Sequence, residues 1–575
     1  MTQADQQLTR FRLKLITKLS PLIFIIILVR LFYWQIIKGP QLSARATQQH
    51  SSVSVLRARR GDIYDTNGEL LAGTNNLYHL YLYKPLMEET TGVLVDKLAP
   101  ILVNDPPPAS PGAEPITPKQ MLEEIEDFLK GRMDLSSNWI SIKHYLTTKQ
   151  KELIDAQELK GLDFEPEYLR YYPESSLSAH ILGFVGKDLA GQEQGYFGLE
   201  GFFDRQLKGR SGKVRSEKDA YGNPILIGNY QLLQSQNGDS ITTTIDKSKQ
   251  FLMENLLKEG IARYSARSGT AIVMETKTGK IRALASFPNY DPGSYPDFNK
   301  DFYKNPVIAS LFEPGSVFKP LIMASALDKK AIQKDSICDI CNGPIHIGEF
   351  SIKTWDETYH PGSSMTDILV NSDNTGMVYV SRKLGEEGFL DTLDSFGFDV
   401  LTGIELQEEV TSKLKQGSSF REIDLATNSF GQGIAITRLQ LLTAFNALAN
   451  SGLLIEPTLI EKIGQKQERT KESTRILKEE TTKDVTDMLI QVVDQSKINW
   501  PRPQGLAVAG KTGTAQIPID GKYDQEKTIT SFIGYFPARN PTYTMLVTLT
   551  EPTTSPWGSE TAAPLWFRIL SQLIL

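Results

Sequence analysis

The chain has 575 residues, more than one hydrophobic core normally holds, so we expect two or three domains. Hydrophobic residues make up 40% and charged residues 23% of the sequence, which is typical of a folded rather than a disordered protein. The formal net charge of −6, with no long basic stripe, argues against nucleic-acid binding. Composition does not choose between an enzyme and a binding protein.

A long apolar stretch near the N-terminus predicts a membrane anchor over 15–38, preceded by a cytoplasmic tail over 1–14. At about 1.5 Å per residue the stretch can cross a hydrocarbon core of about 30 Å. Basic residues cluster at its N-terminal end, from Arg10 to Lys18, which places the N-terminus in the cytoplasm and the rest outside. A cleaved signal peptide is the alternative, but no small-residue cleavage site follows.

The next segment, 39–237, is predicted to form a mixed α+β pedestal. Asn67-Gly68 between apolar runs predicts a hairpin turn, and Leu77–Leu82 alternates like a strand. A proline-rich stretch predicts an inserted loop over 104–118. The apolar spacing from Met121 to Leu129 predicts a short amphipathic helix after that loop.

From about residue 238 the pattern changes, and we expect a second domain over 238–575. Ser240–Ile245 is strand-like, and Asp246 is predicted to cap a helix that ends near Tyr264. Two strands, 268–275 and 280–286, follow with a Thr-Lys-Thr-Gly turn between them. Because strands and helices alternate from there on, we expect an α/β (α+β) domain.

The two cysteines, Cys338 and Cys341, lie outside the cell in this topology. They could pair as a disulfide or remain as two reduced thiols. A zinc site would recruit His346 and His360, but those spacings differ from the usual zinc modules. We therefore expect no metal and no cofactor.

Three short patterns carry the expected chemistry. They are Ser316-Val-Phe-Lys319, Ser372-Asp-Asn374 and Lys511-Thr-Gly-Thr514. They match the S-x-x-K, S-x-N and K-T-G patterns found in penicillin-binding proteins and class A β-lactamases.

Each pattern also occurs elsewhere in the chain, including copies that begin at Ser412, Ser136 and Lys277. Ser412 lies in a charged stretch, Ser136 precedes the second domain, and Lys277 begins the turn between two strands. Only the set at 316, 372 and 511 has the required order within one domain. Order and context therefore select this set, where the letters alone would not.

The residue types suit nucleophilic catalysis. Ser316 follows a Pro-Gly pair, so we expect its hydroxyl at a helix N-terminus with Lys319 one turn further on. A buried lysine among polar groups can lose its proton near neutral pH and activate the serine. Lys511 follows an apolar strand, 506–510, whose edge can align an extended peptide. The amides of Ser316 and Thr514 would form an oxyanion hole.

Nearly the whole chain resembles a class B penicillin-binding protein. Besides the three motifs, the resemblance rests on Arg60–Asp65, Arg170–Pro173, Gly198–Gly201, Phe312–Ser316 and Gly431–Gly433. It implies a β-lactamase-like transpeptidase domain, in which helices cover both faces of a central antiparallel sheet. It also implies an elongated pedestal or dimerisation domain and one transmembrane helix.

The resemblance implies a β-lactam-sensitive peptidoglycan D,D-transpeptidase of the bacterial cytoplasmic membrane, with its catalytic domain on the outer side. Ser316 would attack the penultimate D-alanine carbonyl of a stem peptide after activation by Lys319. Ser372 and Lys511 would relay the proton to the leaving amine. The implied substrate-binding residues are Asn374, Thr512, Gly513 and Thr514.

The implied partners are donor and acceptor stem peptides, β-lactam antibiotics and the cell membrane. No glycosyltransferase-like stretch precedes the pedestal, so strand polymerisation is expected from a SEDS-family glycosyltransferase, alongside other divisome or elongasome proteins. Phe312–Gly315 and Asp219–Gly222 look closer to the division branch of the family than to the elongation branch. A septal role is therefore predicted, with elongation as the alternative.

Three other functions are weighed against this reading. A D,D-carboxypeptidase or a β-lactamase would hydrolyse the acyl-enzyme, and class A hydrolysis uses a glutamate. The closest match to that glutamate motif, Glu422–Leu425, is followed by Ala426 where asparagine is expected. A β-lactam sensor would need a cytoplasmic output domain, and only a short segment is predicted to lie inside.

Overall fold

The computed structural model describes residues 3–103, 117–217, 231–467, 471–519 and 522–574. Residues 1–59 with 209–237 form one compact unit, and residues 60–208 with 238–575 form the other. Most of the predicted proline-rich loop, up to residue 116, lies outside the described residues, as does Asp219–Gly222.

The first unit contains the apolar N-terminal helix. The helix α1 (Gln3–Phe32) continues into a π-helical turn, η1 (Tyr33–Ile37), and α2 (Gly39–His50) follows. Within the described residues, 7–37 is the one stretch long and apolar enough to cross a membrane. A helix that is apolar on all sides and unburied has the character of a membrane span. The strands β1 (Ser51–Leu56), β8 (Gly212–Glu217) and β9 (Gln231–Leu233) form this unit's antiparallel sheet.

A five-stranded antiparallel sheet organises the second unit. Its strand order is β12-β11-β23-β22-β21, so β21 lies at one edge. The strands are β11 (Ser268–Glu275), β12 (Ile281–Phe287), β21 (Ala509–Ile519), β22 (Lys522–Phe536) and β23 (Tyr543–Thr550).

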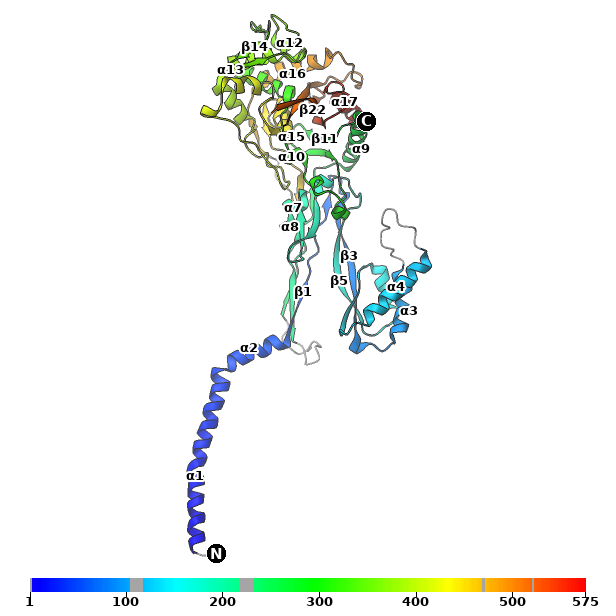
Figure 1. Ribbon diagram of the computed structural model, residues 1–575, viewed down its shortest axis with the longest axis vertical. Helices are drawn as coiled ribbons and strands as arrows, with labels where there is room; N and C mark the ends of the chain where they lie inside the picture. Colours follow the sequence, from blue (N-terminus) through cyan, green and yellow to red (C-terminus); the bar gives the residue numbers. More distant parts are fainter. Residues whose placement is uncertain (1–2, 104–116, 218–230, 468–470, 520–521, 575) are drawn as a thin grey trace. The chain divides into compact units, whose positions relative to one another are not determined.

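Helices cover both faces of this sheet (Figure 1). On one face α9 (Lys247–Tyr264) and α17 (Ala562–Leu573) bury Ala271 and Val273 of β11. On the other face α15 (Arg438–Ala449) and α16 (Glu479–Asp494) share a core with Ile272 and Met274. Because alternate residues of a strand face opposite sides, β11 needs an unbroken apolar run. The predicted fold class is confirmed.

Several predicted elements are present with nearly the expected bounds. The Asp246 carboxylate accepts a hydrogen bond from the Lys249 amide and caps α9, which ends at Tyr264 as predicted. β11 and β12 flank the predicted turn, and this turn contains the second K-T-G copy at Lys277. The strand before α9, β10 (Ile241–Thr243), is shorter than predicted.

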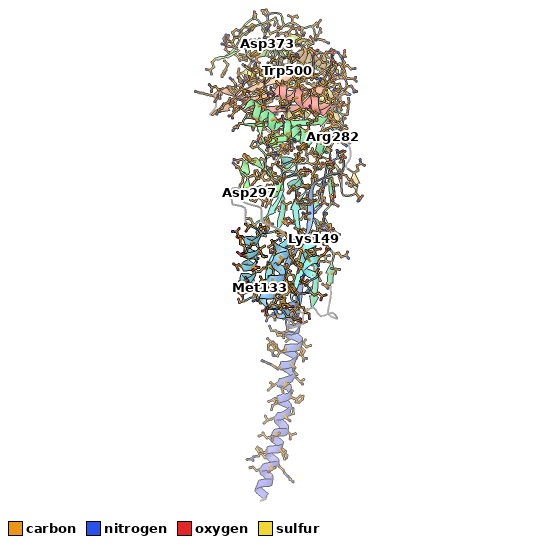
Figure 2. All side chains as sticks on the ribbon, turned by 90° about the vertical axis from the view of Figure 1, so that its right-hand side faces the viewer. Met133, Lys149, Arg282, Asp297, Asp373 and Trp500 are labelled. Atoms are coloured by element: carbon orange, nitrogen blue, oxygen red, sulfur yellow. A yellow bond between two sulfur atoms is a disulfide. The ribbon has the colours of Figure 1, made fainter. Side chains whose placement is uncertain are left out.

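A second sheet joins N-terminal strands to strands from later in the chain, in the order β19-β18-β10-β2-β3-β4 with β5 also paired to β3. β2 (Ile63–Tyr64) and β3 (Leu70–Tyr83) form the predicted hairpin, and β4 (Trp139–Leu146) and β5 (Leu162–Tyr171) flank β3. The helices α3 (Thr91–Leu102) and α4 (Pro118–Met133) pack on this sheet, and Met133 of that core is labelled in Figure 2. The predicted amphipathic helix is therefore α4.

The remaining described elements are short, apart from α13. They are η2 (Lys84–Leu86), α5 (Thr148–Asp155), α6 (Ala179–Leu182), β6 (Phe184–Lys187), β7 (Glu193–Tyr196), α7 (Gly198–Phe202), α8 (Asp204–Lys208), η3 (Pro292–Asp297), η4 (Lys300–Phe302), α10 (Pro306–Ala309), β13 (Leu311–Phe312), η5 (Gly315–Val317), α11 (Lys319–Asp328), β14 (Ile345–Ile347), β15 (Phe350–Ile352), α12 (Met365–Val370), α13 (Asn374–Ser395), η6 (Gly417–Ser419), α14 (Glu422–Asn428), β16 (Ile436–Thr437), β17 (Leu453–Ile455), β18 (Ile460–Ile463), β19 (Lys466–Gln467) and β20 (Ser473–Arg475).

A buried ion cluster links three segments of the second unit. The Arg60 Nε atom lies 2.7 Å from Glu200 Oε2, and Arg170 Nε lies 2.5 Å from Glu200 Oε1. Arg60 Nη1 also donates to Asp204 Oδ1 at 2.7 Å. The Glu200 side chain is fully buried, so its charge is balanced only by these neighbours. All three segments carry motifs on which the family resemblance rests.

We expect Glu200→Ala to lower the free energy of unfolding by about 3–5 kcal/mol, because two buried guanidinium groups lose their shared carboxylate. Urea unfolding followed by tryptophan fluorescence measures the change. As a control, Glu88→Ala removes an exposed partner of Lys160 and should leave the free energy of unfolding nearly unchanged. Equal effects of the two substitutions would contradict a buried cluster that depends on Glu200.

Candidate active site

Ser316 lies in a tight turn immediately before a buried helix. The 3-10 turn η5 carries the serine, and the α-helix α11 begins only at Lys319. Ser316 therefore lies at the N-terminal end of this helical segment, as predicted, but in a 3-10 turn rather than in the α-helix. Gly315 has a φ of 61°, and this left-handed conformation cannot be part of a right-handed helix. Ser316 is half-buried, whereas Lys319 is fully buried.

The serine turn is held by the Gly-Gln-Gly segment. The Gly315 amide donates to the Gly431 carbonyl at 3.0 Å. A Cβ atom at Gly431 would lie 2.3 Å from the Gly315 carbonyl oxygen, so only glycine fits there. The resemblance segment Gly431–Gly433 thus packs directly against the turn that carries Ser316.

The K-T-G motif lies within the edge strand β21. Residues 506–508, predicted as part of the preceding strand, are outside it, because β21 begins at Ala509 and includes the motif. A Cβ atom at Gly513 would lie 2.9 Å from Val317 Cγ1 and 3.2 Å from the Pro314 carbonyl oxygen. The strand backbone therefore approaches the serine turn closely. The predicted position at a sheet edge is confirmed.

The hydroxyl of Ser372 lies between two buried lysines. Lys319 Nζ lies 3.3 Å from Ser372 Oγ, 2.6 Å from the Ser372 carbonyl oxygen and 2.8 Å from Asn374 Oδ1. Lys511 Nζ donates to Ser372 Oγ at 3.1 Å and to the Thr512 carbonyl at 3.2 Å. Ser372 has a left-handed backbone with a φ of 54°. The structure thus brings residues of all three motifs into one polar cluster.

Burial changes the protonation of both lysines. The pKa of Lys319 is well below its usual value because the side chain is buried and because Lys511 is close. Burial lowers the pKa of Lys511 to about 7. Two ammonium groups that share one hydroxyl repel each other, so the cluster favours a neutral lysine at physiological pH.

Asp373 is a buried charge that the sequence analysis did not single out, and Figure 2 labels it. Its Oδ1 atom accepts hydrogen bonds from the Gly376 amide and the Thr375 hydroxyl. Through the bond from Gly376, Asp373 caps the N-terminus of α13. Its charge acts to raise the pKa of Lys319, against the stronger effects of burial and Lys511. The sequence signal that could have identified Asp373 is an aspartate directly before a helical pattern.

Two exposed tryptophans were also missed. The Trp355 indole donates to the carbonyl of Asn371, next to Ser372, at 3.2 Å. Trp557 precedes Gly558, whose amide donates to Thr514 Oγ1 at 3.0 Å. The two rings lie 5.2 Å apart between centroids, with planes at 65°. No sequence pattern predicts this contact, because the two tryptophans are far apart along the chain.

The structure argues against the two alternative sites, a zinc site at the cysteines and a hydrolytic glutamate. Cys338 and Cys341 form a disulfide, so their sulfurs are not available as thiolate metal ligands. Glu422, the closest match to a hydrolytic glutamate, is 60% exposed and forms an ion pair with Arg382 at 2.9 Å. An exposed, paired carboxylate is a poor candidate for a buried general base.

Comparison with known proteins agrees with this geometry. Residues 269–571 match the penicillin-binding protein transpeptidase domain, and residues 55–243 match the penicillin-binding protein dimerisation domain. The chain belongs to the class B penicillin-binding proteins. This family member is 30% identical over 567 residues to stage V sporulation protein D of Bacillus subtilis, covering 97% of this chain and 84% of the relative.

Two further proteins illustrate the likeness. Peptidoglycan D,D-transpeptidase FtsI of Escherichia coli K12 is 26% identical over 95% of this penicillin-binding protein and 89% of the relative. The crystal structure of penicillin-binding protein 2X from Streptococcus thermophilus superposes with a TM-score of 0.78 at 23% identity. The match covers 91% of this chain and 80% of that chain, and it shows the fold.

Proposed function

We propose that this class B penicillin-binding protein, a peptidoglycan D,D-transpeptidase, works through a covalent acyl-enzyme on Ser316. The supporting observation is the Ser372 hydroxyl held between Lys319 and Lys511 beside the serine turn. This arrangement provides both a proton acceptor for the nucleophile and a proton donor for the leaving group.

In the first step the Ser316 oxygen bonds to the penultimate D-alanine carbonyl carbon of the donor stem peptide, and its proton moves to Lys319 Nζ. The peptide C–N bond then breaks, and the terminal D-alanine amine takes a proton relayed through Lys511 and Ser372. In the second step an acceptor amine attacks the ester, which forms the cross-link and restores the serine. A β-lactam would acylate Ser316 by the same first step.

Substrate binding is assigned to the free edge of β21. An extended stem peptide can add main-chain hydrogen bonds to an unpaired strand edge. The amides of Ser316 and Thr514 are proposed to bind the carbonyl oxygen as charge develops on it. Asn374 is proposed to hold the acyl chain, and the substrate carboxylate is assigned to Thr512 and Thr514, with Gly513 allowing close approach.

The Trp355–Trp557 pair is proposed to form one wall of the donor site, since both rings are exposed next to residues of the second and third motifs. We expect Trp557→Ala to lower kcat/KM for a stem-peptide donor about tenfold. The reason is that the substrate loses one aromatic contact, which contributes about 1.5 kcal/mol. Trp139→Ala, on the distant strand β4, is the matched control with a 58% exposed ring. Equal kinetics for both variants would exclude this wall.

A direct test supplies the full-length protein in detergent with lipid-linked stem peptides and a glycosyltransferase. Mass spectrometry should detect cross-linked product and free D-alanine in equal amounts, and both should vanish after treatment with a penicillin. Digestion of the penicillin-treated protein should place the added mass on the peptide that contains Ser316. Release of D-alanine without cross-links would instead indicate a carboxypeptidase, and an added mass on another serine would refute the nucleophile.

The proposal extends to topology and partners. The domain division is proposed as a cytoplasmic tail (1–14), a membrane anchor (15–38), a pedestal (39–237) and a transpeptidase domain (238–575). Protease added outside intact cells should therefore degrade the region after residue 38 and spare the tail. A SEDS-family glycosyltransferase is the proposed polymerising partner, with other divisome proteins around it.

A septal role is proposed because Phe312–Gly315 resembles the division branch of the family. Depletion of the protein in its own cells separates the two roles. Filamentous cells with unfinished septa are expected if it serves division. Rounded cells that still divide would show an elongation role instead.

A further inference from the structure

Three metal-ligating side chains meet on the N-terminal sheet, outside the active site. They are His79 of β3, His144 of β4 and Glu167 of β5, and one ligand atom from each lies within 4.8 Å of the other two. The chain has six histidines, and two of them are in this cluster. Nothing in the proposed transpeptidase chemistry uses these residues.

An irregularity in β4 creates the cluster. In a regular strand Ser141 and His144, three residues apart, would point to opposite faces. The register of β4 against β3 shifts between Leu80 and Tyr78, and Tyr145 in this stretch has a φ of 61°. Bulges re-aim side chains, and strained backbone at a bulky residue often accompanies functional sites. Here the bulge places Ser141 and His144 together beside His79.

The Ser141 hydroxyl lies close to a nitrogen of both imidazoles. The Ser141 hydroxyl oxygen lies 2.8 Å from His79 Nε2 and 3.3 Å from His144 Nε2. Ligands of a tetrahedral Zn²⁺ site, with bonds of about 2.0–2.1 Å to nitrogen, lie at similar separations of about 3 Å from one another. The Ser141 oxygen is thus at a ligand-like separation from each of the two nitrogens.

Carboxylates surround the imidazoles. Glu167 Oε1 lies 2.8 Å from His144 Nδ1, and its second oxygen accepts from the Tyr145 amide at 3.2 Å. Glu165 Oε2 lies 3.9 Å behind His79 Nδ1. A carboxylate behind a ligating imidazole, as Glu165 is behind His79, fixes the orientation of the ring. The Glu167 side chain is only 9% exposed, so its charge gains from a nearby cation.

A purely structural cluster of hydrogen bonds is the competing explanation. The two imidazoles are stacked, with centroids 3.9 Å apart and planes at 8°. Stacking holds the two rings parallel, so their in-plane lone pairs do not point at one ion in this arrangement. For both lone pairs to reach one ion, His144 has to turn, which its half-exposed side chain permits.

We propose that His79, His144 and Glu167 bind one divalent transition-metal ion, with the Ser141 hydroxyl or water in the fourth position. Two imidazoles and one carboxylate are a recurring Zn²⁺ ligand set, whereas Ca²⁺ and Mg²⁺ take oxygen ligands. The ion would link β3, β4 and β5, because each strand supplies one ligand. This metal site is independent of the proposed function of Ser316.

The test uses the full-length protein without a histidine tag, stripped of metal with a chelator and titrated with Zn²⁺ by calorimetry. We expect one ion per chain, a higher unfolding temperature with Zn²⁺, and no response to Mg²⁺. His144→Asn should weaken Zn²⁺ binding about 10- to 100-fold. The matched control is His346→Asn, an exposed histidine of β14 that should bind like the parent.

Two controls distinguish a loss of metal ligands from a loss of folding. Penicillin labelling of each variant reports that the catalytic part is folded, so a loss of zinc binding cannot be attributed to unfolding. Co²⁺ in place of Zn²⁺ should give visible absorption bands of a four- or five-coordinate ion in the parent and not in His144→Asn. The proposal is overturned if the parent binds no Zn²⁺ below millimolar concentration, or if the two variants bind alike.

Discussion

Replacing Ser316 by alanine should abolish covalent labelling by a fluorescent penicillin, with a fall in the acylation rate of at least about 10⁴-fold. The reason is chemical: without the hydroxyl no ester can form, and the remaining groups of the site only bind the inhibitor. Gel fluorescence of the full-length protein measures the label over time. The neighbouring turn should be undisturbed, because its backbone is held by Gly315 and Gly431.

The second S-x-x-K copy offers a matched control. Ser412 Oγ is buried and has no hydrogen-bond partner among the described residues, so Ser412→Ala costs little stability. This variant should be labelled at the parent's rate. If Ser316→Ala is labelled like the parent while Ser412→Ala is not, the nucleophile is Ser412 and the assignment is wrong. Slow loss of label from the parent would fit a transferase better than a hydrolase.

The second large effect is expected for Lys319→Met, which should lower the acylation rate by about 10²–10⁴-fold. Methionine fills a similar volume but cannot accept the proton of Ser316 or donate to Ser372 and Asn374. Stopped-flow acylation by a chromogenic β-lactam measures the rate. Lys415→Met, the lysine of the second S-x-x-K copy, should leave the rate unchanged.

The same substitution should stabilise the protein. The folded-state pKa of Lys319 is lowered by burial and by Lys511, so below its unfolded value of 10.5 the lysine destabilises the fold. That cost is largest at low pH and fades as the pH rises toward 10.5. Removing the lysine should raise the free energy of unfolding at pH 7 by about 1–4 kcal/mol. Lower activity with lower stability would instead indicate a structural role.

The pH dependence of the acylation rate distinguishes the role of Lys319 from that of Lys511. Acid protonates Lys319, which removes the base, so the acylation rate should fall on the acidic side. Deprotonation of Lys511, whose pKa is about 7, removes the proposed proton donor, so the rate should also fall on the alkaline side. Lys511→Arg keeps its charge at all accessible pH values and should remove the alkaline limb. An unchanged alkaline limb in this variant would contradict the relay.

Much of the fold could be predicted because it depends on local patterns. The apolar run of the first helix and the Asp246 cap of α9 are visible within a few residues of sequence. The same holds for the β11–β12 pair and its turn. These signals arise from backbone hydrogen bonding and side-chain periodicity over one element. The order of the three motifs likewise required only the linear sequence.

Element boundaries near the active site were less predictable. The sequence indicated a helix N-terminus at Ser316, and the structure places a 3-10 turn there, held through Gly315 and Gly431, before α11 begins at Lys319. Likewise the K-T-G motif lies inside β21, since its pairing with β22 extends through Lys511 and Gly513. Both differences come from contacts between segments that are far apart in the chain, which local propensity does not include.

The sequence by itself determined the apolar N-terminal helix and the fold class, and it led to the proposed roles of Ser316, Lys319, Ser372 and Lys511. Only the tertiary structure decided that Ser372 would lie between the two lysines, and that Trp355 would meet Trp557. The bulge that brings His144 beside His79 was also decided there. These positions depend on strand register and on the burial of charges across the whole unit, because long-range pairing sets them and no short pattern encodes it.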